Sequence, residues 1–225
     1  MQKNMIIKRY ERKWLIKKIN KDQLNLILAR SSFFFKDQFP NRKVNSIYFD
    51  DNKLSSVREN IDGINHKQKI RVRWYGNSSL INKANIEIKK KVGFQNSKLQ
   101  LNINEINNFS HKKNKDLNLI KNLVKKKIKS SKVLRPTAIT SYDRQYYISN
   151  NNLIRATLDF NIKSSLIKSN FDLDVTKNYS HLILELKYDV DLDDFVRFNL
   201  KNNSFRLSKN SKYVNSFILN RSFTT

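Results

Sequence analysis

Three glutamates in this chain are each followed, two residues later, by a lysine: Glu11 and Lys13, Glu87 and Lys89, Glu185 and Lys187. In a β-strand, residues i and i+2 project from the same face, so each pair would place an acid and a base side by side on a sheet. Arg71 and Arg73 add a purely cationic pair at the same spacing. The guanidinium group of arginine can donate two parallel hydrogen bonds to phosphate oxygens, and the ammonium group of lysine is a compact positive charge. A sheet face with these side chains therefore favours phosphate as a ligand.

Carboxylates are the side chains in this sequence best suited to hold a metal ion. The chain has no cysteine, and its three histidines show no metal-ligand spacing. Mg²⁺ and Mn²⁺ prefer oxygen ligands, and one or two carboxylates suffice where phosphate and water complete the octahedron. Glu87 and Glu185, each in the middle of an expected strand, are the predicted ligands. A structural ion pair is the alternative for Glu87.

Several other kinds of site are excluded by the sequence. Gly63, Gly76 and Gly93 lie too far apart to form a glycine-rich phosphate-binding loop. No G-x-S-x-G or other nucleophile signature occurs, and the lack of cysteine excludes thiol catalysis and disulfides. If phosphate is bound, side chains must bind it.

The charge balance points to a polyanionic partner. The chain has 45 basic and 19 acidic residues, a formal net charge of +26, which creates a strong positive field. Nucleic acid, an anionic membrane surface and inorganic or nucleotide phosphates all fit this field. The charge alone does not choose among them.

The length of the chain and its low content of glycine and proline favour one domain spanning residues 1–225. Three glycines and two prolines interrupt the sequence, and no Gly/Ser/Pro-rich linker divides it. The first residues lack the apolar core of a signal peptide, and no stretch is long and apolar enough to span a bilayer. The expected location is therefore the cytoplasm.

Strands dominate the expected secondary structure. Alternation and enrichment in β-branched and aromatic residues predict them near 8–17, 44–50, 67–76, 84–92, 98–102, 136–149, 153–162 and 181–190. Helices are predicted after a cap at Asn20, along the apolar stripe Leu117, Ile120, Val124 and Ile128, and from Ser211, burying Tyr213, Phe217 and Ile218. Phe33, Phe34 and Phe35 are expected in the core.

Most of these strands are apolar on one side and charged on the other, which is compatible with two architectures. In the first, the sheet packs its apolar face on helices and turns the charged face to water, where Glu–Lys neighbours form weak ion pairs. In the second, the sheet closes with its charged face inward and helices cover the outside. Because unpaired desolvated charges are strongly disfavoured, such a lumen must stay wet or hold a polyanion.

Eight ordered motifs resemble the VTC domain, the catalytic domain of vacuolar transporter chaperone-type polyphosphate polymerases. They are RYERKWLI (9–16), SIYFDD (46–51), KIRVRWYG (69–76), IEIKKK (86–91), RPTAITSYDRQYY (135–147), RATLDF (155–160), LILELKY (182–188) and SKYVNSFIL (211–219). The resemblance runs in order over nearly the whole chain. It implies a triphosphate tunnel metalloenzyme: an α+β fold with an antiparallel, closed, eight-stranded β-tunnel, a charged lumen and helices outside.

The resemblance also implies an activity and a set of site residues. Members of the family transfer the γ-phosphate of ATP to a growing polyphosphate chain with a divalent metal, often manganese, so Mn²⁺ or Mg²⁺ is the expected cofactor. The implied phosphate-binding residues are Lys13, Arg71, Arg73, Lys89, Lys98, Arg144, Arg155, Lys187 and Lys212. Among them Lys13, Arg71, Arg73, Arg144 and Arg155 would act in catalysis with Glu185, which matches the family's metal-binding glutamate.

The first strand departs from the wider superfamily, because it reads E-R-K where the triphosphatases have E-x-E-x-K. Hydrolysis of tripolyphosphate or a nucleoside triphosphate on the same fold is thus one alternative to polymerisation. A basic nucleic-acid-binding protein is another, although no specific nucleic-acid partner is expected. The expected partners are ATP and polyphosphate, and a membrane-protein partner and the oligomeric state stay open.

Overall fold

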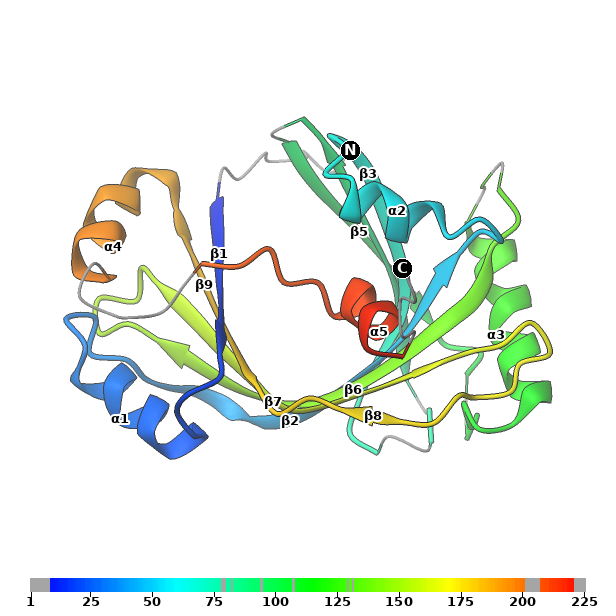
Figure 1. The fold of residues 1–225 in the computed structure, drawn as a ribbon, viewed down its shortest axis with the longest axis horizontal. Coiled ribbons are helices and arrows are strands. Elements are labelled where there is room, and N and C mark those ends of the chain that lie inside the picture. Colours follow the sequence, from blue (N-terminus) through cyan, green and yellow to red (C-terminus); the bar gives the residue numbers. More distant parts are fainter. Residues whose placement is uncertain are drawn as a thin grey trace. The chain divides into compact units, whose positions relative to one another are not determined.

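The computed structural model describes residues 9–77, 80–81, 83–93, 95–106, 108–128, 130, 132–200 and 207–220, apart from the side chains of residues 95, 96 and 220. In chain order the elements are β1 (Arg9–Ile16), α1 (Lys21–Arg30), β2 (Lys36–Asp50), α2 (Ser55–Ile61), β3 (His66–Tyr75), β4 (Ala84–Val92), β5 (Gln95–Ile103), α3 (Asn114–Lys127), β6 (Arg135–Ile148), β7 (Arg155–Leu166), β8 (Lys177–Asn178), β9 (Leu182–Asp189), a 3-10 turn (Val190–Leu192), α4 (Asp193–Leu200) and α5 (Lys212–Asn220) (Figure 1). The predicted α+β class is confirmed.

The strands are hydrogen-bonded in the order β1-β9-β7-β6-β2-β3-β4-β5, and β8 pairs with β7. The ladders β1–β9, β9–β7, β7–β8, β2–β3, β3–β4 and β4–β5 are antiparallel, as predicted. Within the described residues, however, the sheet has nine strands, and its path ends at β1 and β5 with no ladder joining them. The prediction of a closed eight-stranded barrel is therefore not confirmed.

Strand β1 also contacts residues that follow α4 in the chain. Trp14 forms an isolated antiparallel bridge with Leu207, and the Ser208 N–H donates to the Lys13 carbonyl at 2.8 Å. Leu207 and Ser208 therefore lie beside β1.

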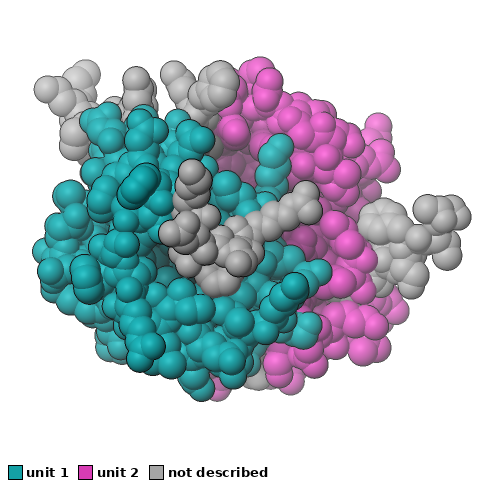
Figure 2. Space-filling model, turned by 60° about the vertical axis from the view of Figure 1, so that its left-hand side comes forward, with its two compact units in different colours: residues 1–42, 143–161, 180–210 teal, residues 43–142, 162–179, 211–225 magenta. Residues whose placement is uncertain are grey.

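The residues gather into two compact units, each assembled from three stretches of chain (Figure 2). Unit 1 contains residues 1–42, 143–161 and 180–210, and unit 2 contains residues 43–142, 162–179 and 211–225. Strands β2, β6 and β7 contribute residues to both units. The single-domain organisation stays a prediction.

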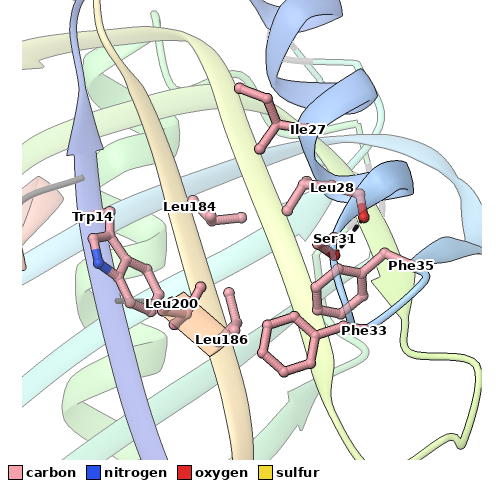
Figure 3. A pocket seen from close by; sticks show the side chains of 9 residues that line it. All are labelled: Trp14, Ile27, Leu28, Ser31, Phe33, Phe35, Leu184, Leu186 and Leu200. Carbon is pink, nitrogen blue, oxygen red and sulfur yellow. Dashed lines mark hydrogen bonds between the residues drawn. The ribbon is translucent and has the colours of Figure 1, made fainter. Parts of the chain in front are cut away.

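In unit 1, helices α1 and α4 cover the apolar face of β1 and β9 (Figure 1). Leu24 and Leu28 of α1 and Val196 of α4 are buried with Trp14 and Leu184 of the strands. This packing leaves an apolar cavity of about 20 Å³ (Figure 3). Since that volume is close to the minimum for one water molecule, this face is packed core and not a ligand site.

In unit 2, two helices pack on opposite faces of the strands. Helix α3 buries Leu117, Ile120 and Val124 against the apolar face of β3 and β4. Helix α5 packs Tyr213 and Phe217 in a separate cluster that includes Tyr48, Ala138 and Leu166. Because side chains alternate along a strand, Tyr48 of β2 faces away from the α3 side, on which Ile47 and Phe49 lie. Helix α5 therefore lies on the charged side of these strands (Figure 1).

The predicted strands and helices are largely confirmed, including the cap of α1. The Asn20 side chain accepts from the Gln23 N–H and the Gln23 side chain accepts from the Asn20 N–H, both at 2.9 Å. The sequence missed α2, α4, β8 and the first half of β2, because short amphipathic segments and polar strand residues give weak periodicity.

The prediction that Phe34 and Ile218 are buried in the core is wrong. Phe34 is 65% exposed, whereas Phe33 and Phe35 are buried, because the chain turns at Phe34 with a positive φ of 46°. Ile218 is 47% exposed because it lies on the outer side of α5, away from Tyr213 and Phe217. In both cases the local backbone geometry decides which of several neighbouring apolar residues is buried.

Candidate functional site

The register of β3, β4 and β5 arranges charged side chains in rows across one face. Arg71 lies opposite Glu87, and Glu87 lies opposite Gln100. The neighbouring row consists of Lys69, Lys89 and Lys98. Residues directly opposite on one face of antiparallel strands have Cβ atoms about 4.5–5.5 Å apart. Strands β3, β4 and β5 thus form one continuous surface with charged side chains from all three.

Glu87 is the centre of this surface, with three cations around one buried carboxylate. Arg71 donates to its Oε2 from both Nε, at 2.8 Å, and Nη2, and Arg73 Nη1 lies 3.6 Å from the same oxygen. Lys98 Nζ is 2.8 Å from Oε1. Burial by itself would raise the pKa of Glu87, but the charges of Arg71, Arg73 and Lys98 outweigh it and lower the pKa to about 2. The four residues Arg71, Arg73, Glu87 and Lys98, here named the unit 2 cluster, carry a surplus of two positive charges.

Two tyrosines that the sequence did not single out hold the arginines of this cluster. Arg71 Nη1 donates to the Tyr48 hydroxyl at 3.4 Å, and Arg73 Nη2 donates to the Tyr142 hydroxyl at 3.3 Å. Arg73 is only 8% exposed. Alternation could have found Tyr48 and Tyr142, since each shares a strand face with polar neighbours, but the strand order that puts Tyr48 opposite Arg71 is not visible in the sequence.

Helix α5 brings a further lysine to the same face of unit 2. Lys212 Nζ lies 4.3 Å from the centroid of the Tyr142 ring, a cation–π contact. Tyr213 stacks on Tyr48 with centroids 4.7 Å apart, and Lys69 donates to the Ser211 hydroxyl at 3.0 Å. The predicted phosphate ligand Lys212 therefore lies beside the aromatic rings that hold Arg71 and Arg73.

Unit 1 carries a second charged group, in which acids and bases alternate between two strands. Glu11 of β1 lies opposite Lys187 of β9, and Lys13 lies opposite Glu185. Lys13 Nζ is 2.6 Å from Glu11 and 3.4 Å from Glu185, while Lys187 Nζ is 2.6 Å from Glu185 and 3.9 Å from Glu11. These four residues are here named the unit 1 cluster. Two of the three Glu-x-Lys pairs predicted from the sequence thus belong to one cluster.

The electrostatics of the unit 1 cluster keep Lys13 and Glu185 ionised. Burial would raise the pKa of Glu185, but the charges of Lys13, Lys187 and Arg144 outweigh burial and hold that pKa well below its usual range. Burial likewise would lower the pKa of Lys13, but Glu185 and Glu11 outweigh it and raise the pKa. Glu185 is a buried carboxylate, 7% exposed, that carries its charge at neutral pH.

Strands β6 and β7 add two arginines near this cluster. Arg144 binds Asp159 through two parallel bonds, Nε to Oδ1 at 2.6 Å and Nη2 to Oδ2 at 2.7 Å. Arg155 lies opposite Lys187 in the β7–β9 ladder and is exposed. Sequence reasoning did not assign Asp159 a role, although its position in the RATLDF motif, on the face of Arg155, could have suggested one.

The oxygen atoms around Glu185 are compatible with a divalent metal ion. Its Oε2 contacts Lys13 at 3.4 Å, longer than a good hydrogen bond. Thr157 lies directly opposite Glu185 on β7, and its buried hydroxyl has no hydrogen-bond partner among the described residues. No group of three or more His, Cys, Asp or Glu side chains suited to a metal occurs in the described part of the chain. Glu185 would therefore hold a metal with few protein ligands, as Mg²⁺ sites on phosphate substrates commonly do.

Glu87 fits a metal less well than Glu185, because it contacts three cations, with Arg71 and Lys98 within 2.8 Å of its two oxygens, whereas one oxygen of Glu185 has only the longer contact of 3.4 Å to Lys13. A metal ion could bind there only after displacing Lys98 or an arginine. Its role as a metal ligand stays a prediction, and its observed contacts are those of a charge-balancing ion pair.

All the predicted site residues lie in the described ranges, and they fall into two sets. Arg71, Arg73, Glu87, Lys89, Lys98 and Lys212 belong to unit 2, and Lys13, Arg144, Arg155, Glu185 and Lys187 belong to unit 1. Lys89 is exposed, and its place in the site comes from its row between Lys69 and Lys98. The catalytic and binding roles of both sets remain predictions.

The helices of the described residues include none with the length and apolar character needed to cross a membrane.

Among solved structures, this fold is similar to that of a provisionally assigned adenylate cyclase from Bacillus halodurans. The TM-score is 0.50 at 13% identity, over 95% of this chain and 100% of that chain. A provisionally assigned adenylyl cyclase from Hippeastrum, described as having a dominant triphosphatase activity, gives a TM-score of 0.47 at 13% identity, over 92% of this chain and 95% of that one. At these identities the likeness concerns the fold alone.

No curated protein matches the sequence. The VTC domain, by contrast, matches residues 8–219, which include every element from β1 to β9 and nearly all of α5. Arg71 and Arg73 of KIRVRWYG, Glu185 of LILELKY and Lys212 of SKYVNSFIL all lie within the match. This chain belongs to the VTC domain family.

Proposed function

We propose that this protein is a polyphosphate polymerase, which transfers phosphoryl groups from ATP to a growing polyphosphate chain with the help of a divalent metal. The observation that carries the proposal is the charge surplus of the unit 2 cluster. Arg71, Arg73 and Lys98 share one buried carboxylate, so two positive charges lack an acid within the cluster. A polyanion would compensate them, and unpaired buried cations would otherwise be costly.

The arginines of the unit 2 cluster suit the transition state of phosphoryl transfer. That state spreads negative charge over the phosphoryl oxygens, and fixed cations aimed at those oxygens lower the barrier. Arg71 and Arg73 are held by Glu87, Tyr48 and Tyr142, so their guanidinium groups need little reorganisation. Lys89, Lys98 and Lys212 would neutralise neighbouring phosphates of the chain.

The unit 1 cluster would supply the metal ligand and further cations. Mn²⁺ or Mg²⁺, when held by Glu185, would neutralise charge on phosphate oxygens. Lys13 and Lys187 flank Glu185 and would bind phosphate while restraining that carboxylate, and Arg144 and Arg155 would add to the positive field. No general base is needed, because the terminal phosphate oxygen of the polyphosphate is already ionised. The closed tunnel implied by the family resemblance stays a prediction.

The products formed from ATP test this proposal. Purified protein with ATP and Mn²⁺ should form long polyphosphate chains, measured by ³¹P NMR and gel electrophoresis. Release of orthophosphate without chains would favour the alternative, a triphosphatase, and no reaction of ATP at all would contradict both.

Glu185→Gln tests the metal assignment with nearly unchanged side-chain shape. We expect activity to fall at least about a hundredfold, because an uncharged amide is a weak ligand for a hard cation. Glu11→Gln is the matched control, since Glu11 contacts the same two lysines but is about one-third exposed. It should keep activity within a few fold. Full activity of Glu185→Gln at low Mn²⁺ would refute the assignment.

A further inference from the structure

The charged face of β3, β4 and β5 ends in a row of uncharged amides. The register continues from the Arg71–Glu87–Gln100 row to Arg73, Asn85 and Asn102. Each residue of this row shares its strand face with the row before it, because i and i+2 project alike. Along one sheet face, the side chains thus change from lysines, through the arginine–glutamate centre, to asparagines beside Arg73.

The asparagines line a cavity of about 620 Å³, within the range of about 300–1,000 Å³ typical of small-molecule sites. Its walls are formed by Asn85, Asn102 and Asn104 together with Ala84, Ile103 and Ile106. Lys83 is the one charged residue among the described residues of its lining. Ala84 and Ile103 are core residues on the opposite face of the sheet, so the amides of Asn85 and Asn102 are the lining on the charged face, where Asn85 lies opposite the buried Arg73.

We propose that this cavity binds the nucleoside of the nucleoside triphosphate donor while the unit 2 cluster binds its phosphates; the inference rests on the proposed function. An asparagine amide offers donors and an acceptor at once, as the edges of a base and the hydroxyls of a ribose require. Among the described residues, the side chains of Asn85, Asn102 and Asn104 form no hydrogen bond, so none must be broken when a ligand binds.

Tyr75 extends the same face of β3 by one more step beyond Arg73. Tyr75 is 48% exposed. An exposed aromatic ring near the amide row is a suitable surface for stacking of a base. Arg73 would then mark the boundary between the phosphate-binding and nucleoside-binding parts of the face.

Binding of ATP and of tripolyphosphate distinguishes a nucleoside subsite from a phosphate subsite, because tripolyphosphate has the phosphates alone. We would measure both by isothermal titration calorimetry without added metal, which prevents metal-dependent turnover. The Asn85→Ala/Asn102→Ala double variant should bind ATP at least about fivefold more weakly, as expected for the loss of two hydrogen bonds. Its affinity for tripolyphosphate should stay within twofold of that of the unchanged protein.

Gln68→Ala is the matched control, because Gln68 is an amide of the same sheet that lies on the opposite face of β3 and outside the cavity. It should bind both ligands normally. Equal loss of ATP and tripolyphosphate binding in the double variant, or no loss of either, would overturn the nucleoside subsite and leave the phosphate site standing. If the unchanged protein binds neither ligand, the proposed function itself fails, and the subsite with it.

Discussion

Glu87 is only 3% exposed, yet it stays ionised because three cations surround it. A pKa of about 2 in the folded protein, against 4.5 for an ordinary glutamate, means that folding favours the charged form. Because the folded pKa is the lower one, this contribution to stability is fully present above about pH 4.5. It is lost as the pH falls toward 2.

Glu87→Gln should lower the free energy of unfolding at pH 7 by about 3 kcal/mol, since each pKa unit corresponds to about 1.4 kcal/mol. The variant should also show a flatter dependence of stability on pH between 4.5 and 2, measured by urea unfolding. Glu105→Gln is the control, because Glu105 pairs with Lys127 at 3.0 Å on the surface, where an ion pair contributes little. Equal stability of Glu87→Gln and the unchanged protein at pH 7 would contradict the expected role.

The same variant separates the two roles considered for Glu87. If Glu87 balances the cations, its loss raises the charge of the unit 2 cluster by one, and tripolyphosphate should bind more tightly. If Glu87 is a metal ligand, the requirement for Mn²⁺ should change instead.

At the scale of elements, Tyr213 of α5 forms hydrogen bonds to the charged side of unit 2. The Tyr213 hydroxyl donates to Asp50 Oδ2 at 2.8 Å and is 2.9 Å from the Thr137 hydroxyl. Burial, and then the charge of Asp50, raise the pKa of Tyr213 well above its usual value, so the hydroxyl keeps its proton. Asp50 in turn accepts from the Ser56 and Val57 N–H groups at the start of α2.

Tyr213→Phe should lower the free energy of unfolding by about 1–3 kcal/mol, because the buried Asp50 carboxylate loses a donor. The variant should also bind tripolyphosphate more weakly, since α5 positions Lys212. Tyr147→Phe is the control: it removes a buried hydroxyl that donates to the neutral Asn25 side chain at 2.6 Å within unit 1, whereas α5 belongs to unit 2. If both variants reduced stability equally and left binding unchanged, Tyr213 would be a structural residue without a positioning role.

The turn between α1 and β2 contains Phe34 in the left-handed region, at a φ of 46°. This conformation costs a non-glycine residue about 1–2 kcal/mol of conformational free energy, and the cost is smaller for asparagine. Since the Phe34 side chain is mostly exposed, Phe34→Asn should raise the free energy of unfolding by roughly 0.5–1 kcal/mol.

Leu26→Asn controls for the removal of an exposed apolar side chain. Leu26 is 57% exposed in the middle of α1, where asparagine is a poorer helix former, so this variant should be less stable. Thermal unfolding followed by circular dichroism measures both. A lower melting temperature for Phe34→Asn would show that the turn carries no such strain.

At the scale of the whole molecule, a net charge of +26 would attract any polyanion, including RNA. The location of the basic residues distinguishes polyphosphate from RNA as the partner. Arg71 and Arg73 lie in the unit 2 cluster, whereas α3 carries Lys125, Lys126 and Lys127 in its last turn.

The double variant Arg71→Ala/Arg73→Ala should therefore lose polyphosphate binding by at least about tenfold while any weak, salt-sensitive binding of RNA persists. Fluorescence polarisation with labelled polyphosphate and a labelled RNA, at 50 and 200 mM salt, measures both. Lys125→Ala/Lys126→Ala removes the same charge from α3 and should leave polyphosphate binding nearly unchanged. Retention of polyphosphate binding by the arginine variant would contradict the proposed site.

The sequence by itself determined the strands that carry Glu11, Glu87 and Glu185, the face on which each lies, and the family. These features follow from alternation with a period of two and from short motifs, which are local properties of the chain. The cap at Asn20 and the buried stripe of α3 were predictable for the same reason.

Only the tertiary structure decided which charges meet. The expected pairs of residues i and i+2 form at Glu11–Lys13 and Glu185–Lys187, both at 2.6 Å. Glu87, however, contacts Arg71, Arg73 and Lys98 from the two neighbouring strands, and Lys13 also bridges to Glu185 across β1 and β9. Strand order and register set these contacts, and both depend on packing between segments far apart in the sequence. The three Glu-x-Lys pairs therefore look alike in the sequence but differ in the fold, where Glu11 and Glu185 share Lys13 and Lys187 while Glu87 contacts three cations of the neighbouring strands.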